Sequence, residues 1–471
     1  MQYYSLQKQS PNVDFRIAAI TGQAPDKGLY FPSEIPKFTA AQIENFKTLD
    51  KASLAFELMR PYVGGTIDDA TLKNICAETI NFDFPLVPIT DTISSLELFH
   101  GPTLAFKDVG ARFMSRCLGY FSKQERAENA TANDHKSQED KTQGEKPNTV
   151  LVATSGDTGG AVANGFLGVT GVNVIILYPK GKVSPIQELQ LTTLGQNITA
   201  LEVDGSFDDC QAIVKEAFMD GELNEAYNLT SANSINVARW LPQQLYYFFA
   251  WQQWVAKYQD TEGNYPAMNI VVPSGNFGNI CAGMIAKESG LPLGHFVAAC
   301  NANDVVTRYM ATEKYEVKPS VVTVSNAMDV GNPSNFVRIL EMMQNNFTTL
   351  SNALTSYSIT DTDTKATIAR VYKTNNYILD PHGAVAFIAA EHFLSEQQVN
   401  IKTNSTTEFA FNAGAIILET AHPVKFPEVV EEAIGQSLSI PASVQNLFER
   451  EKVSIPLAPN YTAFKNWMLK K

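Results

Sequence analysis

Cysteine is scarce in this sequence of 471 residues and shows no pairing pattern. The five cysteines stand far apart, at positions 76, 117, 210, 281 and 300. Without a CxxC pair, neither a zinc ribbon nor the disulfide framework of a small secreted domain is supported. The six histidines include no pair four residues apart, so we expect no metal site.

Basic residues are also in the minority. Lysine and arginine number 36 against 49 aspartates and glutamates, which gives a net charge of -13. This balance, together with the lack of a basic stripe, argues against a nucleic-acid partner. An anionic substrate stays open, because a local cluster of hydrogen-bond donors can outweigh the overall charge.

Long apolar runs are missing as well. No run approaches the ~20 residues that a membrane helix needs. Residues 1–10 lack the charged-then-apolar pattern of a secretory signal. We therefore expect a cytoplasmic protein without a membrane partner, which agrees with the unpaired cysteines.

The composition itself is that of a globular enzyme, with 44% hydrophobic and 18% charged residues. A chain of this length exceeds one ordinary hydrophobic core, so we expect more than one domain. We predict an N-terminal region over residues 1–95, a smaller and mobile α/β domain over 96–235, and a larger α/β domain over 236–471.

One stretch of the smaller domain, residues 122–148, differs from its surroundings. Its apolar side chains are almost all alanines, whereas residues 111–121 have the pattern of a helix. Polar side chains cannot bury enough surface to offset the entropy lost on ordering. We predict a helix over 111–121 followed by a mobile, exposed insertion over 122–148.

Strand and helix patterns alternate along the rest of the chain. The apolar run 150–154 is typical of a buried parallel strand. Ser206 and Asp209 fit the capping pattern of a helix start. This alternation predicts an α/β fold with two parallel-sheet domains and a cleft where they meet. Further strands are predicted over 172–178, 198–203, 268–272, 296–300 and 409–418.

One lysine, Lys107, stands in an apolar context. Leu104, Ala105 and Phe106 precede it, and Asp108 follows. An apolar pocket disfavours the charged ammonium, lowers its pKa, and frees the neutral amine to attack an aldehyde cofactor. The same residues also fit an ordinary lysine whose stem covers apolar surface while its head lies in water.

Two glycine-rich turns follow predicted strands. In the first, PSGNFGN at 273–279, Gly275 and Gly278 allow a tight turn whose N–H groups and following helix form a phosphate cradle. The second is TSGDTG at 154–159, at a strand end of the kind where α/β sheets bind ligands. Its hydroxyl and N–H groups suit a carboxylate. Both turns also fit ordinary connections.

Six stretches together resemble the threonine synthases, pyridoxal-phosphate enzymes with the fold of the tryptophan synthase β subunit (fold type II). They are LELFHGPTLAFKDVGAR (96–112), ATSGDTG (153–159), SANSIN (231–236), VPSGNFG (272–278), VSNAMDV (324–330) and TAHPVKF (420–426). The likeness extends from Gly28 almost to the C-terminus. The strings LELFHGPTLAFKD and SNAMD separate this branch from other enzymes of the fold.

The resemblance implies a lyase of threonine biosynthesis that converts O-phospho-L-homoserine and water to L-threonine and phosphate. It implies pyridoxal 5'-phosphate as cofactor, held by Lys107 as a Schiff base, with Lys107 also moving protons. The cofactor contacts that it implies are Lys107, Gly275, Asn276, Phe277, Gly278, Asn279 and Thr420. The implied substrate contacts are Thr154, Ser155, Gly156, Asp157 and Thr158 for the carboxylate, and Asn233, Arg239 and Lys182 for the phosphate.

Rival functions remain at this point. A serine or threonine dehydratase or a β-replacement enzyme shares the fold but has no use for a second phosphate site at Asn233 and Arg239. A non-catalytic relative is a third possibility, against which the intact Lys107 argues. We expect His100 and His422 to be structural, Asp329 to fix a helix start, and the protein to be a monomer or a homodimer.

Overall fold

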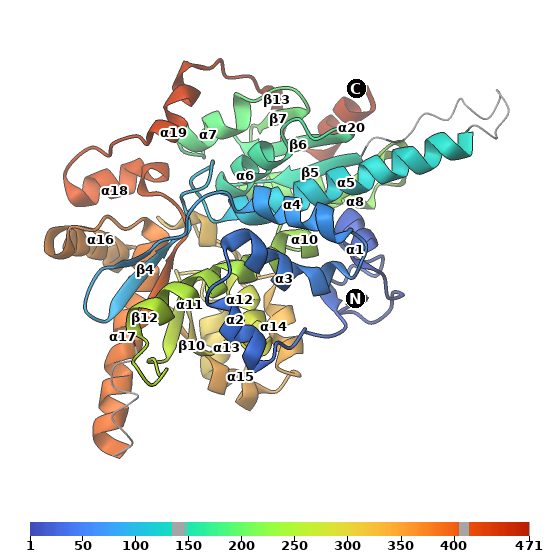
Figure 1. Ribbon diagram of the computed structural model, residues 1–471. Coiled ribbons are helices and arrows are strands. Elements are labelled where there is room, and N and C mark those ends of the chain that lie inside the picture. The colour runs from blue at the N-terminus through green and yellow to red at the C-terminus, as the bar shows by residue number, and fades with distance from the viewer. Residues whose placement is uncertain (134–145, 147, 405–413, 471) are drawn as a thin grey trace.

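The computed structural model describes residues 1–133, 146, 148–404 and 414–470. Two sheets, one parallel and one parallel except for its edge strand β3, form the body of the molecule, each with helices packed against it (Figure 1). The α/β fold predicted from the sequence is thereby confirmed. Among the described residues, no helix combines the length and the apolar character needed to cross a bilayer.

The larger sheet has six strands in the order β11-β10-β9-β12-β4-β3, and all neighbours are parallel except β3 and β4. Alternate residues of β9 join two different apolar cores, with Ile270 in one and Val271 in the other. A strand buried on both faces needs apolar residues at every position, which explains its unbroken apolar sequence. The strands are β3 (Leu86–Pro88), β4 (Ile93–Glu97), β9 (Met268–Pro273), β10 (Leu293–Cys300), β11 (Leu354–Ser358) and β12 (Ala415–Glu419).

The smaller sheet has five parallel strands in the order β13-β7-β6-β5-β8. Three of them confirm strands predicted from apolar runs. Its last strand, β13, comes from the C-terminal end of the chain and pairs with β7. The strands are β5 (Asn148–Ala153), β6 (Val172–Pro179), β7 (Ile198–Val203), β8 (Asn228–Ser231) and β13 (Ile455–Leu457).

An N-terminal layer precedes both sheets. Its antiparallel pair is β1 (Tyr3–Ser5) with β2 (Tyr30–Pro32). Its helices are α1 (Phe15–Thr21), α2 (Ala40–Phe46), α3 (Lys51–Val63) and α4 (Asp69–Thr79).

Helices α5, α6 and α8 contact the smaller sheet, and α20 packs on α8. The predicted cap of α8 is confirmed, because the Ser206 hydroxyl accepts from Asp209 N and the Asp209 side chain accepts in return. The helices of this part are α5 (Lys107–Asn133), α6 (Asp157–Phe166), α7 (Pro185–Thr192), α8 (Phe207–Met219), α9 (Gly221–Ala226), α10 (Val237–Trp240) and α20 (Tyr461–Lys470).

The larger sheet is contacted by α17, which touches β9, β10 and β12, and by α12, which touches β10. The helices of this part are α11 (Leu245–Tyr258), α12 (Gly278–Glu288), α13 (Val305–Thr312), α14 (Phe336–Met342), α15 (Phe347–Ala353), α16 (Asp361–Asn375), α17 (Pro381–Asn404), α18 (Pro427–Ile434) and α19 (Ala442–Gln445). Short 3-10 helices are η2 (Leu241–Gln244), η3 (Asn326–Met328), η5 (Pro423–Lys425) and η6 (Asn446–Glu449).

The predicted end of the helix at residue 121 is wrong. Helix α5 does not stop at residue 121 but continues to Asn133, and Figure 1 shows it projecting from the body. Alanine, glutamate, lysine and glutamine are strong helix formers, so a helix already nucleated on buried residues propagates through them. Residues 134–145 and 147 lie outside the described part of the chain, as do residues 409–413 of the strand predicted over 409–418.

The domain ranges 1–95, 96–235 and 236–471 stay a prediction. The structure adds one feature that these ranges do not include. The C-terminal residues 455–470 pack against the smaller sheet, through β13 on β7 and α20 on α8.

Candidate active site

The loops that carry the predicted site residues follow strands that are neighbours in space. In the larger sheet, β9, β12 and β4 are adjacent and parallel, so their carboxyl ends meet at one edge. The glycine turn 275–279 follows β9, Thr420 follows β12, and the Lys107 loop follows β4. In the smaller sheet, the turn 154–159 follows β5 and the turn 231–236 follows its neighbour β8. Ligands bind at such carboxyl edges of parallel sheets.

Backbone hydrogen bonds set the Lys107 loop beside Thr420. The two segments form an antiparallel bridge between Ala105 and Ala421. Phe106 N donates to the Thr420 carbonyl at 2.9 Å, and His422 N donates to the Leu104 carbonyl at 3.0 Å. The two residues that the resemblance assigns to opposite parts of the cofactor therefore stand on paired backbones.

Asp108 braces the turn before Lys107. Its carboxylate accepts from Thr103 N at 2.9 Å and from the Thr103 hydroxyl at 2.5 Å. Burial raises the pKa of Asp108, while these bonds and the charge of Lys425 oppose the rise. The Tyr246 hydroxyl donates to the Phe106 carbonyl and fixes the other side of the turn.

Lys107 as a residue is partly buried, its amine is desolvated, and within the described residues the amine makes no hydrogen bond or ion pair. Its nitrogen lies 5.7 Å from the centre of the Phe106 ring. Desolvation lowers the pKa of Lys107 to about 8; the Asp157 charge opposes this, and the charges of Lys425 and Arg239 add to it. Such an amine is neutral often enough near neutral pH to act as a nucleophile.

The glycine turn after β9 is as tight as its sequence suggests. A Cβ placed on Gly275 would stand 2.6 Å from the Cα of Met328, so only glycine fits there. Phe277 has φ 59° in the left-handed region and is followed at once by α12. The first N–H groups of a helix have no partner within it, and they face outward as donors for an anion.

The two asparagines of this turn differ. Asn276 is held by protein, because its amide nitrogen donates to Ser234 Oγ at 2.7 Å and its oxygen accepts from Ser334 N at 2.7 Å. Asn279 accepts from the Tyr247 hydroxyl at 2.7 Å, but its buried Nδ2 has no partner in the part of the chain that the structure describes. Asn276 thus joins the turn 275–279 to the turn 231–236, and Asn279 keeps a free donor.

Arg239 lies in the short helix α10, which Asn236 caps by accepting from Ala238 N at 2.9 Å. The arginine is only 3% exposed, yet its Nε and Nη1 have no hydrogen-bond partner among the described residues. Burial lowers its pKa to about 10, so the guanidinium remains charged at neutral pH. Asn233, on the preceding turn, also has a buried oxygen for which the described residues offer no partner. Buried polar groups left unpaired are rare, and here they fit a site for a missing anion.

The turn after β5 uses its threonine internally. The Thr154 hydroxyl accepts from Gly156 N at 2.9 Å and Gly159 N at 2.8 Å, so it holds the turn together. Gly156 has φ 135°, a conformation that L side chains rarely adopt. Ser155 and Thr158 are partly buried beside it, at the start of α6.

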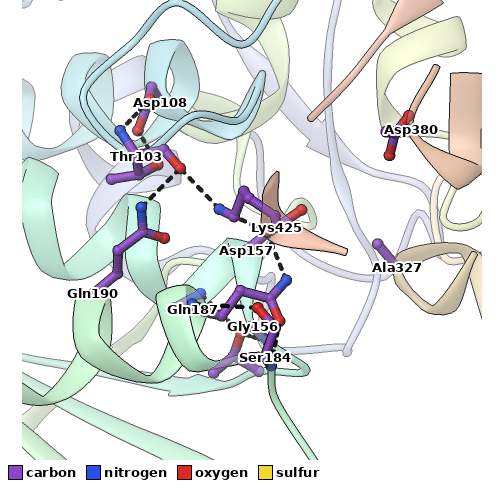
Figure 2. Close-up of polar contacts among 12 residues, drawn as sticks. Thr103, Asp108, Gly156, Asp157, Ser184, Gln187, Gln190, Ala327, Asp380 and Lys425 are labelled. Atoms are coloured by element: carbon purple, nitrogen blue, oxygen red, sulfur yellow. Dashed lines mark hydrogen bonds and ion pairs between the residues drawn. The ribbon is translucent and has the colours of Figure 1, made fainter. Parts of the chain in front are cut away.

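Asp157, the first residue of α6, is paired with a residue that the sequence did not single out. Lys425 Nζ lies 2.7 Å from Asp157 Oδ1 and donates to the Thr103 carbonyl at 2.8 Å (Figure 2). Gln187 Nε2 donates to the same carboxylate oxygen at 2.9 Å. Lys425 lies in the string TAHPVKF, which was the signal available in the sequence, but its side-chain partners come from segments far away in the chain.

The structure does not bring Lys182 into this group. It is exposed after β6, and its charge acts on Asp209 and Cys210 of α8. The charges that act most on Lys107 are those of Asp157, Lys425 and Arg239.

The two histidines near the site have structural contacts. His422 Nδ1 accepts from Val424 N at 3.2 Å and so caps η5, and burial, with the charge of His100, lowers its pKa to about 4. His100, 40% exposed, has its Nε2 2.7 Å from Glu97 Oε2.

The expected role of Asp329 at a helix start is wrong. Asp329 follows η3, and its Oδ1 accepts from Asn301 and Thr323 at 2.9 and 2.7 Å. It ties loops together instead of starting a helix.

The residues present fit pyridoxal phosphate. Lys107 offers a desolvated amine, the turn 275–279 offers unpaired donors with no room for a Cβ at Gly275, and Asn279 adds a free Nδ2. Within the described residues, the Thr420 hydroxyl has no hydrogen-bond partner, so it is free to meet a ring nitrogen.

Comparison with known proteins bears on the same residues. The family model described as pyridoxal-phosphate dependent enzyme matches residues 95–405. Models for the threonine synthase N terminus and C-terminal part match residues 2–80 and 384–468. A threonine synthase from Serratia marcescens is 37% identical over 469 residues, which cover 100% of this chain and 99% of its own.

The chain belongs to the threonine synthase family. The resemblance stated from the motifs is thereby confirmed, and so are the lyase class and the cofactor, pyridoxal phosphate. Two solved structures of the family agree with the fold. The threonine synthase from Escherichia coli superposes with a TM-score of 0.83 at 35% identity, covering 100% of both chains. The pyridoxal-phosphate-bound threonine synthase from Brucella melitensis superposes with a TM-score of 0.85 at 32% identity, covering 99% of this chain and 98% of its own.

Proposed function

We propose that this chain converts O-phospho-L-homoserine and water to L-threonine and phosphate, with Lys107 as the residue that binds the cofactor. One observation carries the proposal: the described residues include one desolvated lysine and two separate sets of unpaired donors, of which Arg239 acts on that lysine through its charge. The first set is the turn 275–279 with Asn279 Nδ2, and the second is the buried guanidinium of Arg239. A cofactor phosphate and a substrate phosphate require two such sets.

Lys107 has the properties of both nucleophile and proton carrier. A pKa near 8 leaves an appreciable neutral fraction at neutral pH, so the amine accepts a proton and returns it without a large barrier. The bound cofactor supplies an electron sink that allows negative charge to develop on substrate carbons. Lys107 then moves protons at the substrate Cα and Cβ.

Arg239 and Asn233 bind the substrate phosphate and hold it as it leaves. A guanidinium donates two parallel hydrogen bonds to a phosphate, and Arg239 has two nitrogens, Nε and Nη1, whose N–H groups nothing in the described protein uses. The cost of burying this charge without a partner is then offset when the dianion binds. A dehydratase or β-replacement enzyme gains nothing from such a charge, which disfavours that alternative.

The turn 154–158 binds the substrate α-carboxylate. Ser155 and Thr158 offer hydroxyl groups, and the start of α6 offers backbone N–H groups and the positive end of its dipole. Thr154 and Gly156 contribute by shaping the turn, since the Thr154 hydroxyl is used within it.

The smaller sheet closes the site during the reaction. Water must add to the substrate at Cβ while bulk solvent is kept away from the reactive carbons, and a moving domain serves both needs. As parts of the same proposal, the enzyme works in the cytoplasm as a monomer or a homodimer.

The deciding experiment is product analysis with the purified chain and pyridoxal phosphate. O-Phospho-L-homoserine should release phosphate, and chromatography should identify L-threonine in equal amount. L-Serine and L-threonine serve as control substrates. Keto acid formed from them at a higher kcat/KM than threonine from the phosphate ester would identify a dehydratase instead and overturn the proposal.

A further inference from the structure

The turn that the proposed function gives to the substrate carboxylate contains a carboxylate of its own. Asp157 is 4% exposed and begins α6 in the middle of this turn. Two carboxylates cannot share a desolvated site unless a cation stands with them, because like charges there repel strongly. The site as built from the turn alone would therefore reject its substrate.

Lys425 is the buried cation that contacts Asp157. Its side chain has no exposed surface, and its nitrogen contacts Asp157 Oδ1 at 2.7 Å and the Thr103 carbonyl at 2.8 Å. Its ion pair with Asp157 is the one salt bridge of Lys425 among the described residues. An ammonium has three N–H donors, so one remains after these two contacts.

The neighbouring cations are already assigned elsewhere. Lys107 is taken by the cofactor, and Arg239 lies on α10 with its free donors for the phosphate. Neither forms an ion pair or hydrogen bond with Asp157 in the described part of the chain, although the charge of Lys107 acts on it without direct contact. The cation in direct contact with the turn 154–158 is thus Lys425.

The pair also joins the two sheets. Asp157 follows β5 of the smaller sheet, whereas Lys425 lies in η5, after β12 of the larger sheet. Figure 2 shows that Gln187 and Gln190 of α7 accompany the pair: Gln187 Nε2 donates to Asp157, and Gln190 Nε2 donates to the Thr103 carbonyl at 3.0 Å. Thr103 in turn bonds to Asp108 beside Lys107. The contact that neutralises the turn therefore also fixes its place relative to Lys107.

We propose that Lys425 is a positioning residue for the α-carboxylate of the substrate: it neutralises Asp157 and so allows the turn 154–158 to accept an anion. The inference rests on the proposed function, which assigns that turn to the carboxylate. Recognition of a free carboxylate then depends on the charge of Lys425 only while Asp157 is charged, so the two residues act as one unit.

The test compares L-alanine with L-alaninamide, which differ only in the carboxylate and carry no phosphate. Binding to the holoenzyme is followed by the change in cofactor absorption, and in parallel by the shift in melting temperature. Wild type should prefer the acid. Lys425→Met should lose about tenfold to a hundredfold of that preference, the range for a charged contact removed from one side. Asp157→Asn/Lys425→Met should recover most of it.

If the role of Lys425 were purely structural, adding Asp157→Asn to Lys425→Met would not restore the preference for the acid. Inorganic phosphate is the matched control ligand, and its affinity should change less than about threefold in these variants, because its proposed partner is Arg239. Two results would overturn the inference: an unchanged acid preference in Lys425→Met, or a double variant as weak as the single one. A wild type without acid preference would overturn it too.

Should Lys425→Met fail to fold, as judged by circular dichroism, Asp157→Asn carries the test alone. It leaves Lys425 with an uncompensated positive charge, so the preference for L-alanine over the amide should stay or rise; a fall would contradict the inference. Failure of the proposed function has a different signature, because a protein that makes no threonine from O-phospho-L-homoserine can still show the acid preference and its dependence on Lys425.

Discussion

Lys425 and Asp157 meet at 2.7 Å although they follow strands of two different sheets, β12 and β5. Their contact places the positive charge of Lys425 at the turn 154–158, and the same charge helps to lower the pKa of Lys107. Three buried or partly buried cations, Lys107, Arg239 and Lys425, stand near two buried carboxylates. The charges of Lys425 and Lys107 hold the pKa of Asp157 below its usual value against the effect of burial, and Arg239 interacts with Asp108. This excess of positive charge suits a substrate with two anionic ends.

The Lys107→Ala variant should bind pyridoxal phosphate without forming a covalent bond. No other amine in the described site lies free and partly accessible, since Lys425 is fully buried and paired. Borohydride reduction followed by peptide mass spectrometry should show the cofactor on the peptide of Lys107 in wild type and no labelled peptide in the variant. A label on another lysine would show that the attachment point lies elsewhere.

Cofactor capture by the cofactor-free chain should depend on pH through the pKa of Lys107. Because that pKa is about 8 instead of 10.5, the capture rate should rise with pH up to about 8 and then level off. Lys425→Met should move this midpoint upward, since it removes a charge that lowers the pKa, and Asp157→Asn should move it downward. Stopped-flow absorbance measures the rates, and midpoints that shift together or not at all would contradict this arrangement.

The same pKa has a consequence for stability with a defined sign. Between pH 8 and 10.5 the unfolded chain holds a proton on this lysine more often than the folded chain does. Stability of the cofactor-free protein from this group therefore rises with pH across that window. Lys107→Met should flatten this part of the curve in chemical denaturation.

Gly275→Ala should weaken cofactor binding. The added Cβ would stand 2.6 Å from Met328 Cα, and backbone cannot rotate away as a side chain can. We expect about 1–3 kcal/mol of lost affinity, the usual cost of overpacking, measured by equilibrium titration with pyridoxal phosphate. Gly221→Ala is the matched control, because a Cβ there meets nothing within 4 Å. Equal losses in both variants would exclude the tight turn as the cause.

The sequence predicted those features of the site that depend on residues close together in the chain, and missed those that depend on residues far apart. Strands such as 198–203 and the Ser206 cap were predicted correctly, because apolar runs and caps are local patterns. The converging loops followed from parallel strands, whose carboxyl ends share an edge. The Lys425 pair was missed, since its partners Asp157 and Thr103 are hundreds of residues away and meet only in the folded chain.

Two further expectations failed for different physical reasons. The charged stretch after residue 121 was expected to leave the helix, but its composition favours a helix once α5 is nucleated on buried residues. Asp329 was expected to begin a helix. Its carboxylate instead accepts hydrogen bonds from Asn301, Asn303 and Thr323 and so links separate loop segments. Composition indicates only local propensity. Tertiary contacts decide whether the helix continues beyond residue 121 and what the Asp329 carboxylate binds.

His422→Asn should retain activity and lose part of the acid sensitivity of the fold. An asparagine oxygen can replace the ring nitrogen that accepts from Val424 N, so the cap of η5 survives. The folded pKa of His422 is about 4 against 6.5 unfolded, so wild type loses stability as pH falls from 6.5 toward 4. Denaturation curves should show a smaller loss in the variant, and His392→Asn, at an exposed position, should leave it unchanged. A collapse of kcat would instead assign His422 a proton transfer.

Two buried arginines offer the sharpest test of the substrate phosphate site. Arg338 has no exposed surface and is fully engaged, donating to the carbonyls of Tyr30 at 3.0 Å and Ile235 at 2.7 Å. Arg239 is buried to a similar degree but leaves Nε and Nη1 unpaired. A charge held for a ligand should contribute to binding, whereas a charge held for the fold should contribute to stability.

Arg239→Met should therefore weaken O-phospho-L-homoserine by about 1.5–3 kcal/mol, the range for charged hydrogen bonds, and leave the free energy of unfolding of the cofactor-free chain unchanged or higher. Arg338→Met should lower that free energy by about 3 kcal/mol or more, because several buried carbonyls lose their donor. Inhibition by inorganic phosphate measures the affinity of the phosphate site, and urea denaturation measures the free energy of unfolding. If Arg239→Met destabilises the fold as much as Arg338→Met and leaves phosphate inhibition intact, the phosphate of the substrate binds elsewhere.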